Sequence, residues 1–150
     1  MEIYKKKLIL IADDDEDDLM FAQKAINANS EESEIDIKLV KDGEELLDFL
    51  YKKGEYADSK HPLPSVIFLD IKMPKLDGLK VLEILKANER LRIIPIIILS
   101  SSKTDINSSY HKGANSYIVK PNIYGEMQEI MGKMKKFWFE AAELPGDDHD

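Results

Sequence analysis

The sequence predicts an α/β protein in which a doubly wound, five-stranded parallel sheet is covered by helices on both faces. Two patterns alternate along the 150 residues: short continuous apolar runs, and segments in which apolar residues recur at helical spacing. Continuous apolar runs are typical of strands buried on both faces, as in a parallel sheet. A strand–helix order that repeats five times therefore favours an open parallel sheet.

The predicted elements follow from these local patterns. The apolar runs that predict strands cover residues 7–12, 35–40, 66–70, 94–100 and 115–120. The segments with helical spacing cover residues 16–28, 43–53, 78–88, 103–111 and 124–142.

Two helix starts carry capping patterns, in which an acidic residue stands three positions after a capping residue. Asp42 is followed by Glu45, and Ser102 by Asp105. The helix predicted at 103–111 has few apolar residues, so we expect it to be weakly held.

Length and composition indicate a single domain without a membrane anchor. We expect the core to span about residues 7–142, with a flexible tail at 143–150. The formal net charge of −8 disfavours a general nucleic-acid binder, which would carry a basic face. The apolar run before Asp13 is too short for a signal peptide or a membrane span, so we expect a cytoplasmic protein.

Polar residues that could bind a ligand or take part in catalysis stand where the predicted strands end. Asp13 and Asp14 follow the first strand, Asp70 ends the third, Ser100 lies at the end of the fourth and Lys120 at the end of the fifth. Ligands of open α/β sheets bind outside the carboxyl ends of the strands. Because the first and third strands are neighbours in a doubly wound sheet, we expect the three carboxylates to converge.

Converging carboxylates predict a magnesium site. Two carboxylates about 4 Å apart repel by roughly 4 kcal/mol at an effective dielectric near 20, and a divalent cation reverses that cost. Oxygen ligands without histidine or cysteine favour Mg²⁺, Ca²⁺ or Mn²⁺ over zinc, and the ligand pattern of a calcium loop is absent. Mg²⁺ fits best because it accepts few carboxylates together with phosphate oxygens. Residues 15–18 are interpreted as helix-start charges, which the helix dipole favours.

Asp70 is the candidate nucleophile at this edge. A carboxylate can attack a phosphoryl group and form an aspartyl phosphate. Lys120 would supply a cation and Ser100 a hydroxyl donor to the transferred group. No histidine stands at a strand end, so the phosphoryl donor is expected to be another molecule.

Four motifs, in this order, resemble the receiver domains of bacterial two-component response regulators. They are "ADDDEDD", "FLDIKMPKLDG" around Asp70, "IIILSSS" with Ser100, and "GANSYIVKP" with Lys120. Thirty residues separate Asp70 from Ser100 and fifty separate it from Lys120, which are the usual spacings of that family. The resemblance covers about residues 7–140 and implies a flavodoxin-like fold with strand order 2-1-3-4-5.

The resemblance implies a phosphoacceptor with a magnesium ion beside it. Asp70 would be phosphorylated, Asp14 would bind Mg²⁺ directly, and Asp13 would act through water. The backbone carbonyl of Lys72 would be a further ligand. The Lys72 side chain replaces a common asparagine, which bears on the lifetime of the phosphate.

The resemblance also implies a switch. Ser100 and Lys120 would contact the phosphoryl group, and Tyr117 would change rotamer with the state of Ser100. Ser100 replaces the more frequent threonine and lacks the methyl group that would restrict its rotamer. The peptide between Lys120 and Pro121 would be cis.

A narrower resemblance is to stand-alone receivers partnered with phytochrome-type histidine kinases. The segment "LYKKGEYADSKHPLPSVIFLD" has their longer loop before the third strand, and "KKFWFEAAELP" resembles their C-terminal helix and tail. It implies a histidine kinase as partner and signalling by protein contact, because no output domain follows. Apart from phosphoryl acceptance and slow self-dephosphorylation, no enzymatic activity is expected.

The aromatic segment "FWF" (137–139) predicts a homodimer. Its three side chains spread over more than one helix face, so they cannot all point inward. Exposed aromatic surface often marks an interface, which we expect to involve the last helix and its neighbours.

Two other functions compete with the signalling module. A magnesium-dependent phosphatase or phosphotransferase for small substrates would commonly carry a second acid two residues after the nucleophile, where this chain has Lys72. A degenerate receiver would bind partners constitutively, but all the expected site residues are present. A P-loop kinase is excluded because its phosphate-binding motif is absent.

Overall fold

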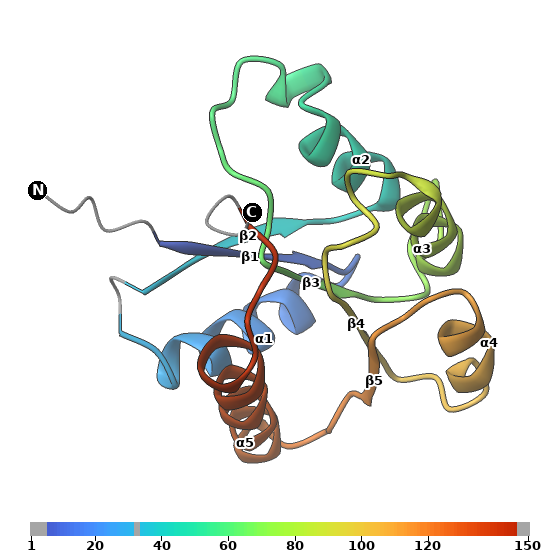
Figure 1. The fold of residues 1–150 in the computed structure, drawn as a ribbon. Helices are drawn as coiled ribbons and strands as arrows, with labels where there is room; N and C mark the ends of the chain where they lie inside the picture. The colour runs from blue at the N-terminus through green and yellow to red at the C-terminus, as the bar shows by residue number, and fades with distance from the viewer. Residues whose placement is uncertain (1–5, 32–33, 147–150) are drawn as a thin grey trace, which may run out of the picture.

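The computed structural model describes residues 6–31 and 34–146, and its strands form one parallel sheet in the order β2-β1-β3-β4-β5 (Figure 1). The strands are β1 (Lys7–Ala12), β2 (Ile35–Val40), β3 (Val66–Leu69), β4 (Ile96–Ser100) and β5 (Ser116–Val119). The predicted parallel sheet and its strand order are confirmed.

Helices cover both faces of this sheet, as predicted. The main helices are α1 (Glu16–Ala28), α2 (Gly43–Tyr51), α3 (Gly78–Ala87), α4 (Ile106–His111) and α5 (Tyr124–Lys135), followed by a π-helical turn, η2 (Lys136–Ala141). A short 3₁₀ turn, η1 (Gly54–Tyr56), lies in the loop before β3. Helices α1 and α5 pack against one face, and α2 and α3 against the other (Figure 1). None of the described helices is long and apolar enough to cross a bilayer.

Side-chain caps define the starts of α1 and α2. The Asp42 carboxylate accepts a hydrogen bond from the Glu45 amide at 2.7 Å, and the Glu45 carboxylate accepts one from the Lys41 amide at 2.9 Å. Asp15 caps α1 by accepting from the amides of Asp17 and Asp18. The cap predicted at Asp42 is confirmed, and so is the interpretation of Asp15 as a helix-start charge.

Helix α4 is shorter than predicted, and the expected cap at Ser102 is wrong. The helix begins at Ile106 with Asp105 at the capping position. The Ser102 hydroxyl instead accepts from the Thr104 amide and donates to the Asp105 carboxylate, so it forms a turn before the helix. Only Ser109 of α4 is buried, which agrees with a weakly held helix.

The apolar core continues beyond the last helix. Leu144 is buried and belongs to the same apolar cluster as Ile35 and Val66, on the face that α1 and α5 cover. The apolar core therefore extends past the predicted boundary near residue 142, and the flexibility of the tail stays a prediction. Residues 147–150, the rest of the predicted tail, lie outside the described residues.

A close approach of two backbone segments positions the end of β3. Gly78, the first residue of α3, donates a backbone hydrogen bond to Ile71 at 2.7 Å. A Cβ atom at Gly78 would overlap the carbonyl oxygen of Asp70 and lie 2.8 Å from the Cα of Ile71. Glycine thus lets the start of α3 pack directly beneath Asp70.

Replacing Gly78 with alanine is expected to lower the free energy of unfolding by about 2–3 kcal/mol, because the backbone of Asp70 and Ile71 must move. Gly125 is the matched control, since no atom outside its own helix and its chain neighbours lies within 4 Å of a Cβ there. Gly125→Ala should be neutral or stabilising by up to about 1 kcal/mol. Urea unfolding of both variants measures the difference, and wild-type stability in Gly78→Ala would contradict this account.

Candidate metal and phosphoryl site

Three carboxylates meet at the carboxyl edge of the sheet. Asp13 and Asp14 follow β1, and Asp70 follows β3, whose end is joined to β1 by a hydrogen bond from the Asp70 amide to Ala12 at 2.9 Å. One oxygen atom of each carboxylate lies within 4.8 Å of the others. The predicted convergence of Asp13, Asp14 and Asp70 is confirmed.

Lys120 reaches this cluster from the far side of β4. It follows β5, two strand spacings or roughly 10 Å from β3, so only a long side chain can cover the distance. Its ammonium lies 2.6 Å from Asp13 Oδ2, 2.8 Å from Asp18 Oδ2 and 3.3 Å from Asp70 Oδ2. With a side chain only 10% exposed, Lys120 is the cation of the site.

Burial sets the electrostatics of the cluster. Asp13 is 3% exposed and Asp70 7%. Burial raises the pKa of Asp13 to about 6, although hydrogen bonds from Lys120 and from the Asp15 amide oppose the shift, and the charge of Asp70 adds to it. Burial alone would lower the pKa of Lys120, but its hydrogen bonds to Asp13 and Asp18 and the attraction of Asp70 outweigh that effect and raise it. Lys120 therefore stays charged.

The donor set fits a hard divalent cation. Within residues 6–31 and 34–146, Asp13, Asp14 and Asp70 form the one group of three or more acidic, histidine or cysteine side chains with suitably close atoms. All its donors are carboxylate oxygens, which suit Mg²⁺ or Mn²⁺. The Lys72 side chain is exposed two residues after Asp70, and coordination by its carbonyl stays a prediction.

Ser100 and Tyr117 are connected through the backbone of Ser102. Ser100 ends β4, is 2% exposed, and its hydroxyl oxygen accepts a hydrogen bond from the Ser102 amide at 3.2 Å. The Tyr117 hydroxyl donates to the Ser102 carbonyl at 2.7 Å. Ser100 and Tyr117, which the resemblance implies as a switch, therefore hydrogen-bond to the amide and the carbonyl of the same residue, Ser102.

The predicted cis peptide before Pro121 is wrong. The described residues contain no cis peptide bond. The trans form is intrinsically favoured before proline by about 0.5–1 kcal/mol. Lys120 reaches its carboxylates from the trans form, so that reach does not require the cis isomer.

Asp18 is the residue that sequence reasoning missed. It was interpreted as a helix-start charge, yet its carboxylate pairs with Lys120, 102 positions away. A local signal was available: Asp18 belongs to the same acidic run as Asp13 and Asp14 and follows Asp14 by only four residues. That spacing alone could not identify Lys120 as the partner.

Comparison with known proteins gives one consistent result. The model of the response regulator receiver domain family matches residues 9–132. Response regulator Rcp1 of Synechocystis sp. is 32% identical over 141 residues, which are 93% of each chain. The crystal structure of the phosphorylated cyanobacterial phytochrome response regulator RcpA has a TM-score of 0.86 at 32% identity, covering 95% of this chain and 100% of RcpA. That of Mn²⁺-bound Rcp1 has a TM-score of 0.83 at 30% identity, covering 93% and 99%.

The raised pKa of Asp13 predicts a pH dependence of stability without metal. Its folded pKa of about 6 exceeds the ordinary value of 3.8, so Asp13 contributes stability below pH 3.8 that is lost as pH rises through 6. Asp13→Asn removes this titration. From pH 4.5 to 7, the free energy of unfolding of Asp13→Asn should therefore rise relative to wild type by about 1–2 kcal/mol.

Urea unfolding in EDTA at both pH values measures this change. Asp17→Asn is the control, because Asp17 is exposed and makes no ion pair among the described residues. A difference between Asp13→Asn and wild type that does not vary with pH would contradict the assignment.

Proposed function

Because the chain belongs to the response regulator receiver domain family, we propose that Asp70 accepts a phosphoryl group from the phosphohistidine of a partner histidine kinase. One observation carries the proposal: the buried Asp70 carboxylate shares its site with two further carboxylates and with the Lys120 ammonium, 3.3 Å away. The similarity to RcpA, named a phytochrome response regulator, supports a phytochrome-type kinase as the partner.

The transfer needs an acceptor oxygen, charge neutralisation and fixed donors. A carboxylate oxygen of Asp70 forms a bond to phosphorus as the phosphorus–nitrogen bond breaks, and the electron pair leaves with the imidazole, which takes up a proton. A bound Mg²⁺ supplies positive charge to the phosphoryl oxygens. Lys120 adds a second positive charge to this environment. The Mn²⁺-bound form of the similar protein Rcp1 supports a divalent cation at this edge.

Phosphorylation would switch the loop that follows β4. The Ser100 hydroxyl turns toward the phosphoryl oxygens, so the Ser102 amide loses its acceptor. The Ser102 carbonyl then moves, and with it the hydrogen bond from Tyr117. Helix α4 is short and has one buried residue, so it can move with the loop at a small cost in free energy. Its movement would change the surface beside β5.

Catalytic turnover on small substrates is disfavoured by the residue two positions after the nucleophile. An aspartyl phosphatase would use a general acid there, and this chain presents the exposed Lys72. The proposed chemistry is therefore limited to phosphoryl acceptance and slow hydrolysis of the aspartyl phosphate.

Incubation with acetyl phosphate and Mg²⁺ should add one phosphoryl group to the protein. Intact-mass spectrometry measures the adduct, which chelation by EDTA should abolish because the carboxylate cluster is then left without its dication. Asp70→Asn should show no adduct, since the acceptor oxygen is lost.

The outcomes separate the three candidate functions. Rapid multiple turnover on sugar phosphates would favour a small-substrate phosphatase. A folded wild-type protein that gains no adduct would overturn phosphoryl acceptance and leave a constitutive binding module.

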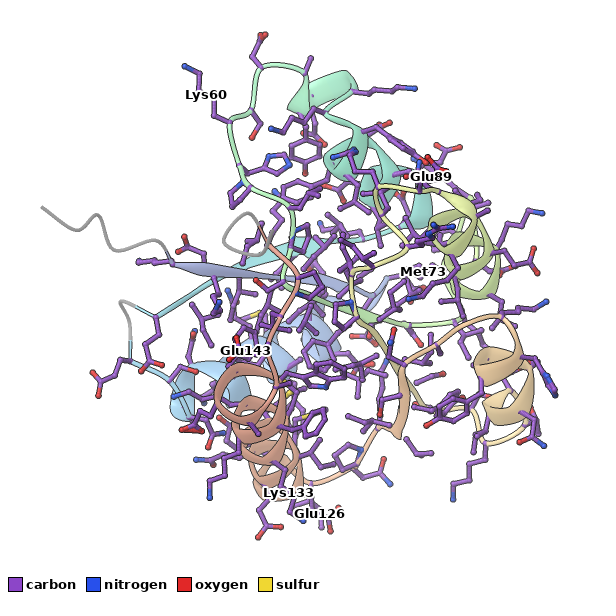
Figure 2. The ribbon with its side chains drawn as sticks, viewed as in Figure 1. Lys60, Met73, Glu89, Glu126, Lys133 and Glu143 are labelled. Carbon is purple, nitrogen blue, oxygen red and sulfur yellow. The ribbon has the colours of Figure 1, made fainter. Side chains whose placement is uncertain are left out.

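The homodimer expected from the aromatic segment is also part of the proposal. Phe137 is 55% exposed in η2, beside an apolar groove of about 310 Å³ between α5 and the edge strand β5. The groove is lined mainly by Ile97, Ile118, Ile130, Met134, Phe137 and Trp138. Lys133 borders it and, like Glu126, extends from α5 into solvent (Figure 2). An apolar groove with a charged rim suits an interface between two copies.

Phe137→Glu is expected to shift the protein from dimer to monomer at micromolar concentration, because it places a charge on this groove. Met20→Glu is the control, since Met20 is 64% exposed on α1 and borders a different groove. Multi-angle light scattering of both variants and the wild type measures the effect. A wild type that is monomeric with and without phosphorylation would contradict the proposed dimer.

A further inference from the structure

The Lys120 ammonium is shared between two kinds of carboxylate. Asp13 and Asp70 belong to the cluster that suits a divalent cation, whereas Asp18 does not. The Asp18 side chain is 44% exposed, against 5% for Asp13 and 9% for Asp70, so it binds the ammonium from the solvent side. At 2.8 Å, its contact is shorter than that of Asp70.

A divalent cation and the ammonium compete for the carboxylates of Asp13 and Asp70. Lys120 lies 2.6 Å from Asp13 Oδ2 and 3.3 Å from Asp70 Oδ2, so it neutralises the charge that a dication would neutralise. Binding of a dication to these carboxylates repels the ammonium. Lys120 must then move away from Asp13, and a buried ammonium without a counter-charge is strongly unfavourable.

We propose that Asp18 is a positioning residue that retains the Lys120 ammonium at the rim of the site when a divalent cation occupies Asp13, Asp14 and Asp70. The inference rests on the proposed function, because it concerns the metal of that site. Asp18 lets Lys120 withdraw from Asp13 without losing its partner, and it keeps the ammonium near the oxygens of Asp70. It thereby couples the first turn of α1 to the end of β5.

The neighbouring Asp17 separates this role from a general effect of negative charge. Asp17 stands in the same turn of α1 and is exposed, and it forms neither an ion pair nor a hydrogen bond with Lys120. Asp17→Asn and Asp18→Asn remove the same formal charge from nearly the same place. A general effect of the lost negative charge would weaken metal binding in both variants. The proposed role predicts weaker metal binding in Asp18→Asn alone.

The test is the affinity of the unphosphorylated protein for Mn²⁺, measured by isothermal titration calorimetry and by electron paramagnetic resonance of free Mn²⁺. Asp18→Asn should weaken binding by about tenfold, the effect of one charge-assisted hydrogen bond at a partly exposed site. Asp17→Asn should change the affinity by less than about twofold, because Asp17 is exposed and forms no ion pair with Lys120. Asp18→Glu, which keeps the carboxylate, should retain most of the wild-type Mn²⁺ affinity.

A second background isolates the contribution of Lys120. In Lys120→Met there is no ammonium to retain, so adding Asp18→Asn should change Mn²⁺ affinity no more than adding Asp17→Asn. An undiminished effect of Asp18→Asn in that background would overturn the inference. Equal losses in the two single variants, or unchanged affinity in Asp18→Asn, would also overturn it.

The wild-type titration separates failure of the proposed metal site from failure of the role of Asp18. A wild type that binds no Mn²⁺ would overturn the metal site of the proposed function, and the role of Asp18 with it. A wild type that binds Mn²⁺ with an affinity that Asp18→Asn leaves intact would overturn the role of Asp18 alone. Circular dichroism melting of each variant confirms that the titrated protein is folded.

Discussion

Like charges buried at one edge of the sheet are the constraint on which the site depends. Parallel pairing of β1 with β3 brings Asp13 and Asp70 together, where burial makes each charge costly. One ammonium, that of Lys120, lies among three carboxylates of this edge. The remaining negative charge makes the edge suited to a hard dication.

The surrounding fold holds this unfavourable arrangement in place. The backbone bond between Asp70 and Ala12 joins the ends of β3 and β1, and Gly78 lets α3 pack beneath Asp70. Asp15 caps α1 directly after the acidic pair, and its amide donates to Asp13 at 3.0 Å. The acidic run thus contains residues with separate positions: one caps a helix, two belong to a carboxylate cluster that suits a dication, and one pairs with a lysine.

The site connects to the surface through a single loop. The Ser102 amide donates to the Ser100 hydroxyl and the Ser102 carbonyl accepts from Tyr117, so the buried hydroxyl and the tyrosine are joined through one residue. Helix α4 follows this loop and carries one buried residue, whereas α1 carries four. The part of the chain that the proposed switch would move is therefore held by little apolar burial.

The sequence by itself determined the elements and the chemistry at their ends. The bounds of β1, β2 and α1 agree with the residues predicted, because burial on both faces or along one helix stripe leaves a local pattern of apolar residues. The carboxylates, the hydroxyl and the lysine could be assigned to one edge because parallel strands end on the same side. The start of α4 was misplaced, since Ser102 can form either a helix cap or a turn within the same short segment.

Only the tertiary structure decided which charges pair and which end segments pack. Asp18 and Lys120 are 102 positions apart, and their contact depends on sheet order and on the face that α1 covers. Leu144 is buried because the chain after η2 returns to the sheet, which no local pattern indicates. The local pattern of apolar residues indicates which side of each segment is buried. The contacts of Asp18 and Leu144 form between distant segments, and only the whole fold brings those segments together.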